Sequence, residues 1–406
     1  MSVVTDLELP QINHLDPSFR GATFHDTMRE LRGRGWLAES PLGYFVLDRE
    51  AVDFFLKSKK LNFPGKLVVE MFGVTDGPLH EEVTRNVLCI DGADHRRLRN
   101  LANPSLTARA VERYRPAIRG FLEELWATVA ARGECEFVAD FAKPYPALTI
   151  ATVMGAPLED AERLYDWSNW IQKQFAADVL EQRAEIEAAI VEFYAYTREL
   201  LARRRAEPKD DLLSSLIAAE EDGDRLSGEE CVNLALNVLI GGVDTTQSQL
   251  CHAMRLFADH PDQWQLLADD PVGLAPAAVD EVMRYEPIVP FTARITLEEI
   301  EYRGVTFPPN TVVMTSAFDA NRDEEVWSEP EAFDITADRE GVRSHTFGAG
   351  IHYCLGANLA RLEMTEALTF LAPRMRDLRL AGEPVLGSVH GIYGIDELPL
   401  SFTPDA

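Results

Sequence analysis

The sequence predicts a mainly α-helical protein with a minor β region. Four long segments carry apolar residues at the three- and four-residue spacing of helices, whereas strand-like alternation is confined to three short segments. With 406 residues, the chain is long enough to bury a large core, as one large domain or two ordinary ones. The sequence shows no internal repeat, no low-complexity stretch and no convincing linker.

Three of the helical segments have ordinary lengths. They cover residues 110–133, 160–175 and 184–207. Gly133 is expected to stop the first helix, because glycine readily adopts the conformation that ends a helix. Pro208 follows the last one, which should therefore close before it.

The fourth helical segment, 226–261, is the longest. Ser227 is a suitable N-cap, and Glu230 three residues later would complete a capping box. From there the helical pattern continues to Pro261.

The middle of this long helix is unusual, because "IGGVDTTQ" (240–247) interrupts an apolar stretch. Each glycine costs a helix about 1 kcal/mol relative to alanine, and threonine and aspartate compete with the helical hydrogen bonds. Either a neighbouring element packs very close to the backbone here, or a ligand lies against it. Close packing would explain the glycines but not the polar cluster beside them.

Strand signals are few and short. They cover residues 43–48, 293–316 and 398–404. The sheet is therefore expected to combine the two ends of the chain with one late meander.

Composition and charge exclude several classes of protein. Hydrophobic residues make up 46% and charged residues 26% of the chain, as in soluble globular proteins. A net charge of −28 should repel nucleic acid and anionic membranes. No leader peptide or spanning segment is recognisable, so we expect a cytoplasmic protein without membrane or nucleic-acid partners. The five cysteines are far apart, which excludes a disulfide framework and a zinc ribbon.

One part of the chain is basic despite the overall charge. Between His95 and Arg119 there is a single acidic residue, Glu112, against seven arginines: Arg96, Arg97, Arg99, Arg109, Arg113, Arg115 and Arg119. This arginine island is either a docking surface for an acidic partner or an ordinary solvated helix face.

Cys354 lies among glycines, directly before an amphipathic helical pattern. The free N–H groups and the dipole at a helix start favour a thiolate, which can bind a haem iron as an electron-donating ligand. An inert buried cysteine, a nucleophile with His352 as its base, and a zinc ligand are alternatives, although no second pair of zinc ligands has a suitable spacing. The residues alone leave an inert thiol and a haem ligand open.

The segment "FGAGIHYCLGANLARLE" (347–363) resembles the haem-binding loop of the cytochrome P-450 family at every fixed position. This resemblance implies that Cys354 is the proximal ligand of haem b (iron protoporphyrin IX) and that Phe347 packs over the sulfur. It also places His352 near a propionate and Gly356 in the cofactor-binding loop. The implied fold is a single cytochrome P-450 domain over 1–406, with about 20 peripheral residues at the N-terminus. In that fold haem lies between a long distal helix and the helix of the cysteine loop.

Further segments resemble segments of this family and occur in the same order along the chain. "IGGVDTT" matches the segment that crosses the distal face of the haem, where the glycines make room for dioxygen and substrate. "DGADHRRLRN" (91–100) resembles the start of the propionate-binding helix, which implies that His95 and Arg99 reach the propionates. Arg294 resembles another arginine of the family, which also binds the haem propionates. The likeness extends from about residue 20 to the C-terminus.

"EVMR" matches the family's Glu-x-x-Arg motif, and residues three apart share a helix face, so Glu281 and Arg284 can form an ion pair that braces the fold. In the family this pair is joined by an arginine that ends a Phe-Asp-x-x-Arg pattern. Here "AFDITADRE" delays the arginine to Arg339, which leaves open the residue that completes the triad.

The implied activity is monooxygenation of an apolar small molecule with O2. The resemblance assigns Asp244 and Thr245 to the proton relay, in which Thr245 hydrogen-bonds dioxygen and Asp244 connects it to solvent. One alternative is a haem-thiolate enzyme that uses peroxide or catalyses no monooxygenation. The intact Asp244–Thr245 pair argues against it. The other alternative is a non-catalytic haem sensor.

Candidate substrate contacts follow from the segments that line the pocket in the family. They are mostly apolar, which indicates an apolar substrate. The candidates are Leu67, Val68, Met71, Phe72, Asn237, Ile240, Gly241, Val243, Val289, Phe291, Ile392 and Tyr393. Each apolar position could also be ordinary core. Asn237, two turns before Thr245 on the same helix face, could bond a substrate oxygen or cap a buried carbonyl.

Electrons must come from another protein, because the chain has no flavin or iron–sulfur motif. The resemblance implies a small acidic ferredoxin with an NAD(P)H-dependent reductase. The arginine island would serve as its docking surface, near Arg96, Arg109 and Arg113.

Overall fold

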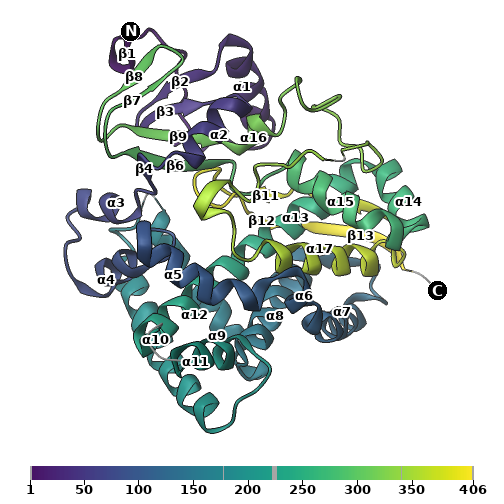
Figure 1. Cartoon of the computed structure of the whole chain (residues 1–406). Helices are drawn as coiled ribbons and strands as arrows, with labels where there is room; N and C mark the ends of the chain where they lie inside the picture. Colours follow the sequence, from purple (N-terminus) through teal and green to yellow (C-terminus); the bar gives the residue numbers. More distant parts are fainter. Residues whose placement is uncertain (1, 177, 222–225, 340, 405–406) are drawn as a thin grey trace. The chain divides into compact units, whose positions relative to one another are not determined.

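The computed structural model describes residues 2–176, 178–221, 226–339 and 341–404 (Figure 1). The chain divides into two compact units. The first consists of Met1–Pro64, Asp280–Cys354 and Leu386–Gly394, and the second of Gly65–Val279, Leu355–Val385 and Ile395–Ala406. Most strands belong to the first unit and most helices to the second, which confirms the predicted mainly α class with a minor β region.

The first unit is built on a five-stranded sheet in the order β2-β3-β9-β6-β4. Its strands are β2 (Leu37–Ser40), β3 (Gly43–Val46), β4 (Leu61–Asn62), β6 (Phe291–Thr296) and β9 (Val312–Ser316). β3 and β9 run parallel and the other neighbours antiparallel, so early and late parts of the chain lie side by side, as the colours in Figure 1 show. A smaller sheet has the order β1-β8-β7, with β1 at Ser2–Val3, β7 at Ile300–Tyr302 and β8 at Val305–Phe307.

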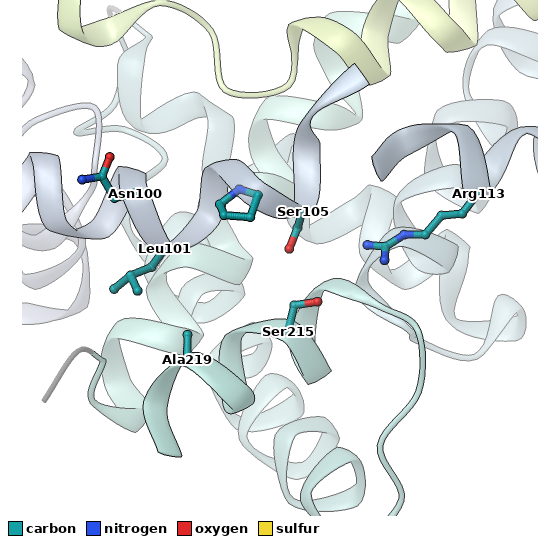
Figure 2. A pocket seen from close by; sticks show the side chains of 7 residues that line it. Asn100, Leu101, Ser105, Arg113, Ser215 and Ala219 are labelled. Atoms are coloured by element: carbon teal, nitrogen blue, oxygen red, sulfur yellow. The ribbon is translucent and has the colours of Figure 1, made fainter. Parts of the chain in front are cut away.

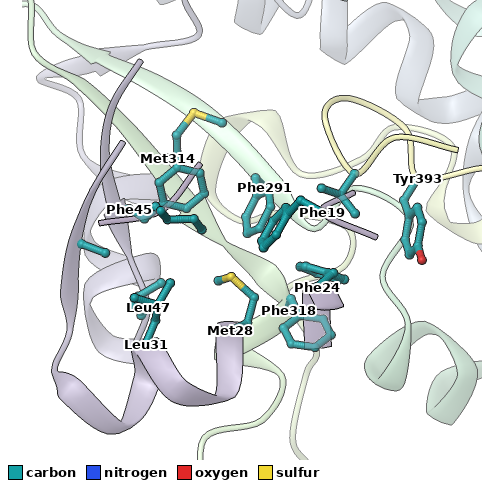
Figure 3. Packing of buried hydrophobic residues seen from close by; sticks show 13 residues of the cluster. Phe19, Phe24, Met28, Leu31, Phe45, Leu47, Phe291, Met314, Phe318 and Tyr393 are labelled. Carbon is teal, nitrogen blue, oxygen red and sulfur yellow. The ribbon is translucent and has the colours of Figure 1, made fainter. Parts of the chain in front are cut away.

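Helix α1 (Gly21–Arg34) covers this sheet through an apolar stripe. Phe24, Met28 and Leu31 recur at helical spacing and are buried against sheet residues that include Phe45 and Phe291 (Figure 3). Two shorter helices complete the unit, α2 (Arg49–Lys57) and α16 (Ala317–Ala320).

The second unit is mainly helical. Its helices are α3 (Gly65–Met71), α4 (Gly77–Arg85), α5 (Gly92–Ala102), α6 (Ala108–Val111), α7 (Arg115–Val129), α8 (Pro144–Met154), α9 (Ala161–Gln172), α10 (Arg183–Ala206), α11 (Leu212–Glu221), α12 (Gly228–Gly242), α13 (Asp244–Asp259), α14 (Pro261–Asp269), α15 (Pro271–Tyr285), whose last residues belong to the first unit, and α17 (Ala357–Leu371). A three-stranded sheet has the order β10-β13-β5, with β10 at Met375–Leu380, β13 at Pro399–Pro404 and β5 at Glu134–Glu136. The remaining strands are β11 (Val385–Leu386) and β12 (Ile395–Glu397).

Most predicted elements are present. The helices over 160–175 and 184–207 correspond to α9, with a short 3-10 turn after it, and to α10. The three strand segments correspond to β3, to β6 through β9, and to β13. Strand β10 was not predicted, because polar and apolar residues alternate poorly in its sequence "MRDLRL". No helix in the described part of the chain is long and apolar enough to span a bilayer.

Two helices predicted as continuous are divided. The segment 110–133 forms α6, a 3-10 turn and α7, because Pro116 lies in the first turn of α7, where a helix tolerates proline, and cannot continue an earlier one. The long helix begins at Ser227 with the predicted capping box to Glu230. It is interrupted at Val243, between α12 and α13.

The Glu281–Arg284 pair is buried in the first unit, and Arg339 completes the triad. Arg284 donates to Glu281 with Nε–Oε2 and Nη2–Oε1 distances of 2.7 and 2.8 Å, and Arg339 donates to the same two oxygens at 3.1 and 3.2 Å. The family's pattern would put the arginine at Ala337. Here a turn at Asp334 and Thr336 carries the chain on to Arg339, which answers the question that the sequence left open.

We predict that Arg339→Ala lowers the free energy of unfolding by about 2 kcal/mol, because the buried Glu281 carboxylate loses two charge-assisted hydrogen bonds. Urea unfolding followed by circular dichroism measures the change. Arg343→Ala is the matched control, since Arg343 is exposed, and its effect should stay within about 0.5 kcal/mol. Equal effects of the two substitutions would show that Arg339 does not brace Glu281.

Candidate functional site

The loop before Cys354 folds back so that this cysteine lies beside Phe347. The Cys354 backbone N–H donates to Phe347 O at 2.9 Å, and the Gly348 N–H donates to His345 O at 2.8 Å. Gly348 and Gly350 have φ values of 69° and 72°, which favour glycine. The fold of this loop therefore depends on its glycines.

These glycines serve different purposes. A Cβ at Gly350 would lie 3.0 Å from Leu56 O, so close packing against α2 excludes a side chain there. A Cβ at Gly348 or Gly356 would have no atom within 4 Å, so these two positions border open space. Helix α17 begins at Ala357, directly after Gly356, and confirms the helix predicted to follow Cys354.

Asn321 ties the cysteine loop to the buried triad. Its backbone carbonyl accepts from Arg284 Nη1 at 3.1 Å, and its side-chain Oδ1 accepts from the His345 N–H at 2.7 Å. Its Nδ2 donates to Thr346 Oγ1 at 3.0 Å, and Thr346 Oγ1 in turn donates to Met283 O at 2.6 Å. Hydrogen bonds therefore connect the α15 end that carries the triad with the start of the cysteine loop.

The interruption between α12 and α13 gives two adjacent glycines opposite roles. A Cβ at Gly242 would lie 2.3 Å from Ile150 Cδ1, so close packing against α8 requires glycine here. Gly241 is exposed, and a Cβ on it would have no atom within 4 Å. Thr245 Oγ1 donates to Gly241 O at 2.6 Å. Close packing therefore explains Gly242, whereas Gly241 borders open space, and a ligand against the backbone there stays a prediction.

Asp244 lies next to Thr245, and its carboxylate is held by helix α9. Ser168 Oγ, which is fully buried, donates to Asp244 Oδ2 at 3.1 Å. Burial raises the pKa of Asp244 to about 7, although the bond from Ser168 acts in the opposite direction. A carboxyl with such a pKa can both take up and release a proton near neutral pH.

The residues predicted to bind propionates are divided between the units. In the second unit, α5 carries His95, which is buried, and Arg99, which is half-buried. In the first unit, Arg294 on β6 is buried and donates through Nη1 to Ala293 O at 2.8 Å, while His352 in the cysteine loop is half-buried.

The donor set fits a haem group. In the first unit, Cys354 would supply a sulfur ligand for iron, and the buried Arg294 has nitrogen donors that suit a carboxylate group. In the second unit, the nitrogen donors of His95 and Arg99 suit such groups as well. Gly348 in the first unit and Gly356 in the second each border open space, which the approach of a flat group to the backbone requires.

Much of the arginine island is engaged inside the second unit. Arg97 pairs with Glu230, Arg115 and Arg119 pair with Glu366, and Arg113 donates to Asp210 at 2.5 Å. Arg113 also lines a surface pocket of about 400 Å³ with Asn100, Leu101, Pro104, Ser105, Ser215 and Ala219 (Figure 2). Arg96 and Arg109 are exposed and form no ion pair with a described residue. Charge available for a partner is therefore concentrated on these two side chains.

The candidate substrate contacts differ in exposure. On α3, Leu67 and Val68 are half-buried and Met71 is 75% exposed, whereas Phe72, directly after this helix, is 45% exposed. Ile240 and Val243 are buried, while Val289, Ile392 and Asn237 are half-buried. Phe291 and Tyr393 lie in the core cluster of the first unit (Figure 3), where the Tyr393 hydroxyl accepts from the Gly21 N–H at 2.9 Å.

Sequence reasoning missed Ser168 and Asn321. Ser168 is a serine on an amphipathic helix, and no pattern in the sequence distinguishes it from other polar positions on that helix. Asn321 directly follows the short helix α16 in "AFDANRD", and its polar side chain at the end of this helix was the available signal.

Comparison with known proteins identifies the family. The family profile described as Cytochrome P-450 matches residues 45–269 and 272–372. Luteothin monooxygenase of Streptomyces thioluteus is 37% identical over 400 residues, covering 97% of this chain and 96% of the relative. Vitamin D(3) 25-hydroxylase of Pseudonocardia autotrophica is 36% identical over 326 residues, covering 79% of each chain.

A solved structure agrees. The crystal structure of CalO2 superimposes with a TM-score of 0.88 at 30% identity and covers 94% of this chain and 96% of its own. The cysteine loop, the interrupted distal helix and these likenesses lead to one conclusion. This chain belongs to the cytochrome P-450 family and is a haem-dependent monooxygenase with the cytochrome P-450 fold.

Proposed function

We propose that this protein oxidises a small apolar molecule, that Cys354 would bind the haem iron, and that Asp244 and Thr245 would form the proton relay. The observation that carries the proposal is the interrupted helix, where the Thr245 hydroxyl and the open position at Gly241 lie one turn apart on one face. Haem with a thiolate ligand supplies the oxidation chemistry, in which one atom of dioxygen enters a C–H bond and the other leaves as water.

The residues of the relay have complementary properties. Thr245 Oγ1 is held by Gly241 O and can donate to dioxygen when it turns to the open face. Asp244 can exchange protons near neutral pH because burial raises its pKa to about 7. Ser168 holds one oxygen of this carboxylate and so limits its rotation. Together, these side chains can deliver protons to reduced oxygen while α9 shields the carboxylate.

Other residues are assigned to the haem propionates and to the substrate. We assign His95, Arg99, Arg294 and His352 to the propionates. Leu67 and Val68 on α3 and Asn237 on α12, which are half-buried, are assigned to the substrate. Relatives named for luteothin and vitamin D(3) support a small-molecule substrate, and the apolar candidates support an apolar one. The two units would work as a single domain in the cytoplasm, where NAD(P)H is available.

Thr245→Ala should still consume NAD(P)H but release peroxide in place of oxidised product, because the hydroxyl that directs protons to dioxygen is gone. Product formed per NAD(P)H consumed is the measurement, with a reconstituted ferredoxin and reductase. Thr245→Ser keeps a hydroxyl and is the matched control, which should retain most of the coupling. Wild-type coupling in Thr245→Ala would contradict the relay.

We further propose that electrons arrive from an acidic ferredoxin that docks on the arginine island. The chain as a whole carries a charge of −28, so a local cluster of cations is needed to attract such a partner. Arg96 and Arg109 are the exposed members of the island without ion pairs among the described residues. Arg113 is engaged by Asp210 and is a poorer contact.

Reversal of both free charges, Arg96→Glu with Arg109→Glu, should slow reduction by the ferredoxin at least tenfold at low salt and weaken its salt dependence, because steering is lost. Stopped-flow reduction at several ionic strengths measures this. The control is Arg343→Glu with Arg379→Glu, two exposed arginines outside the island, which changes the net charge equally. Equal slowing in both double variants would place docking elsewhere.

A further inference from the structure

A buried polar network joins three helices of the second unit. Glu82 on α4 is 1% exposed and accepts from Asn86 Nδ2 at 3.1 Å, from Asn233 Nδ2 of α12 at 2.9 Å and from the Tyr194 hydroxyl of α10. Asn233 Nδ2 also lies 3.1 Å from the Tyr194 oxygen. Every printed bond to the Glu82 carboxylate comes from a donor, which fixes how Asn233 is turned: its NH2 faces Glu82, and its Oδ1 is left to accept elsewhere.

The network continues along α12 to Asn237. Asn237 Nδ2 donates to the Asn233 backbone oxygen at 2.7 Å and to Asn233 Oδ1 at 3.2 Å. Since both of these atoms can only accept, the amide of Asn237 must present its NH2 to Asn233. Its own oxygen, Oδ1, is consequently turned away from the network.

Asn237 lies on a helix face that borders open space. Within 231–240 all residues of α12 are buried except Asn237, which is half-buried. Gly241 and Thr245 follow at intervals of four residues, so all three share one helix face, and Gly241 on it borders open space. Asn237 Oδ1 accepts no hydrogen bond from a described residue. At 1.5 Å per residue, Asn237 lies about 12 Å along the helix from Thr245.

We infer that Asn237 Oδ1 accepts a hydrogen bond from the substrate and that Glu82 is a positioning residue that holds this orientation through Asn233. The substrate is therefore an apolar molecule that carries a hydroxyl or N–H donor, bound about 12 Å along the helix from Thr245. This inference rests on the proposed function and adds the polar group that the substrate carries. A ketone or ether oxygen at the same place can only accept a hydrogen bond, as Asn237 Oδ1 does, so Oδ1 would be left without a donor.

Two matched pairs of probes test the inference in the haem-loaded enzyme: 1-dodecanol with its methyl ether, and androstan-3-ol with its methyl ether. In each pair the ether keeps the oxygen atom but carries a methyl group in place of the hydrogen that the alcohol donates. Spin-state titration should show at least one alcohol binding about tenfold or more tightly than its ether. Asn237→Ala should bring that ratio close to one. Glu82→Gln should do the same, because the amide NH2 of the new glutamine faces the donors of Asn86, Asn233 and Tyr194 and disturbs the orientation of Asn233.

The controls distinguish a positioning role of Glu82 from a general disturbance of the fold. Glu70→Gln is the matched control for Glu82→Gln, because Glu70 on α3 lies outside the network and pairs with His80; it should leave the ratio unchanged. Equal binding of alcohol and ether to the wild type, or no binding of either alcohol, overturns the inference, as does an unchanged ratio in Asn237→Ala. If reduced protein with carbon monoxide shows no thiolate-type spectrum, the proposed function fails instead.

Discussion

The hydrogen-bonded connection from Glu281 and Arg284 to the cysteine loop is the constraint on which the rest of the first unit depends. Arg284 is buried and fully engaged, because its guanidinium donates to Glu281 and to the carbonyls of Asn321, Pro330 and Ala332. Breaking a buried charge pair of this kind costs several kcal/mol, so the segment around Asn321 is held firmly. Asn321 then fixes His345 and Thr346 at the start of the loop that ends in Cys354. A sulfur that must meet a metal within a few tenths of an ångström needs such a support.

The interrupted helix of α12 and α13 loses regular structure at Val243, next to the residues that we propose take part in the chemistry. Gly242 lets α12 approach α8 closely, whereas Gly241 leaves the adjacent face open. The interruption at Val243 lets Asp244 reach Ser168 and leaves Thr245 bonded to Gly241 O. Two glycines and two polar residues weaken the helix, but in exchange they provide an open face with a hydroxyl and a titratable carboxyl beside it. The same face carries Asn237, whose orientation is decided by a carboxylate on another helix.

Much of this could be predicted from the sequence, because the relevant signals are local. The capping box at Ser227, the helix after Cys354 and the short strands follow from residue type and spacing. The division of 110–133 at Pro116 was missed because the periodic apolar pattern runs through the proline. Partners far apart in the chain could not be predicted, since no local pattern marks them. Ser168 beside Asp244, Asn321 beside the cysteine loop and Arg339 in place of Ala337 all depend on how the chain folds in space.

The central claim is that the sulfur of Cys354 binds the haem iron. The carbon monoxide difference spectrum of the reduced protein tests it most directly, with Cys354→His as the comparison. The account predicts a strongly red-shifted Soret band in the wild type, as a thiolate ligand produces, and its loss in the variant although haem is retained. A wild-type spectrum without the red shift, or a red shift that survives in Cys354→His, would contradict the account.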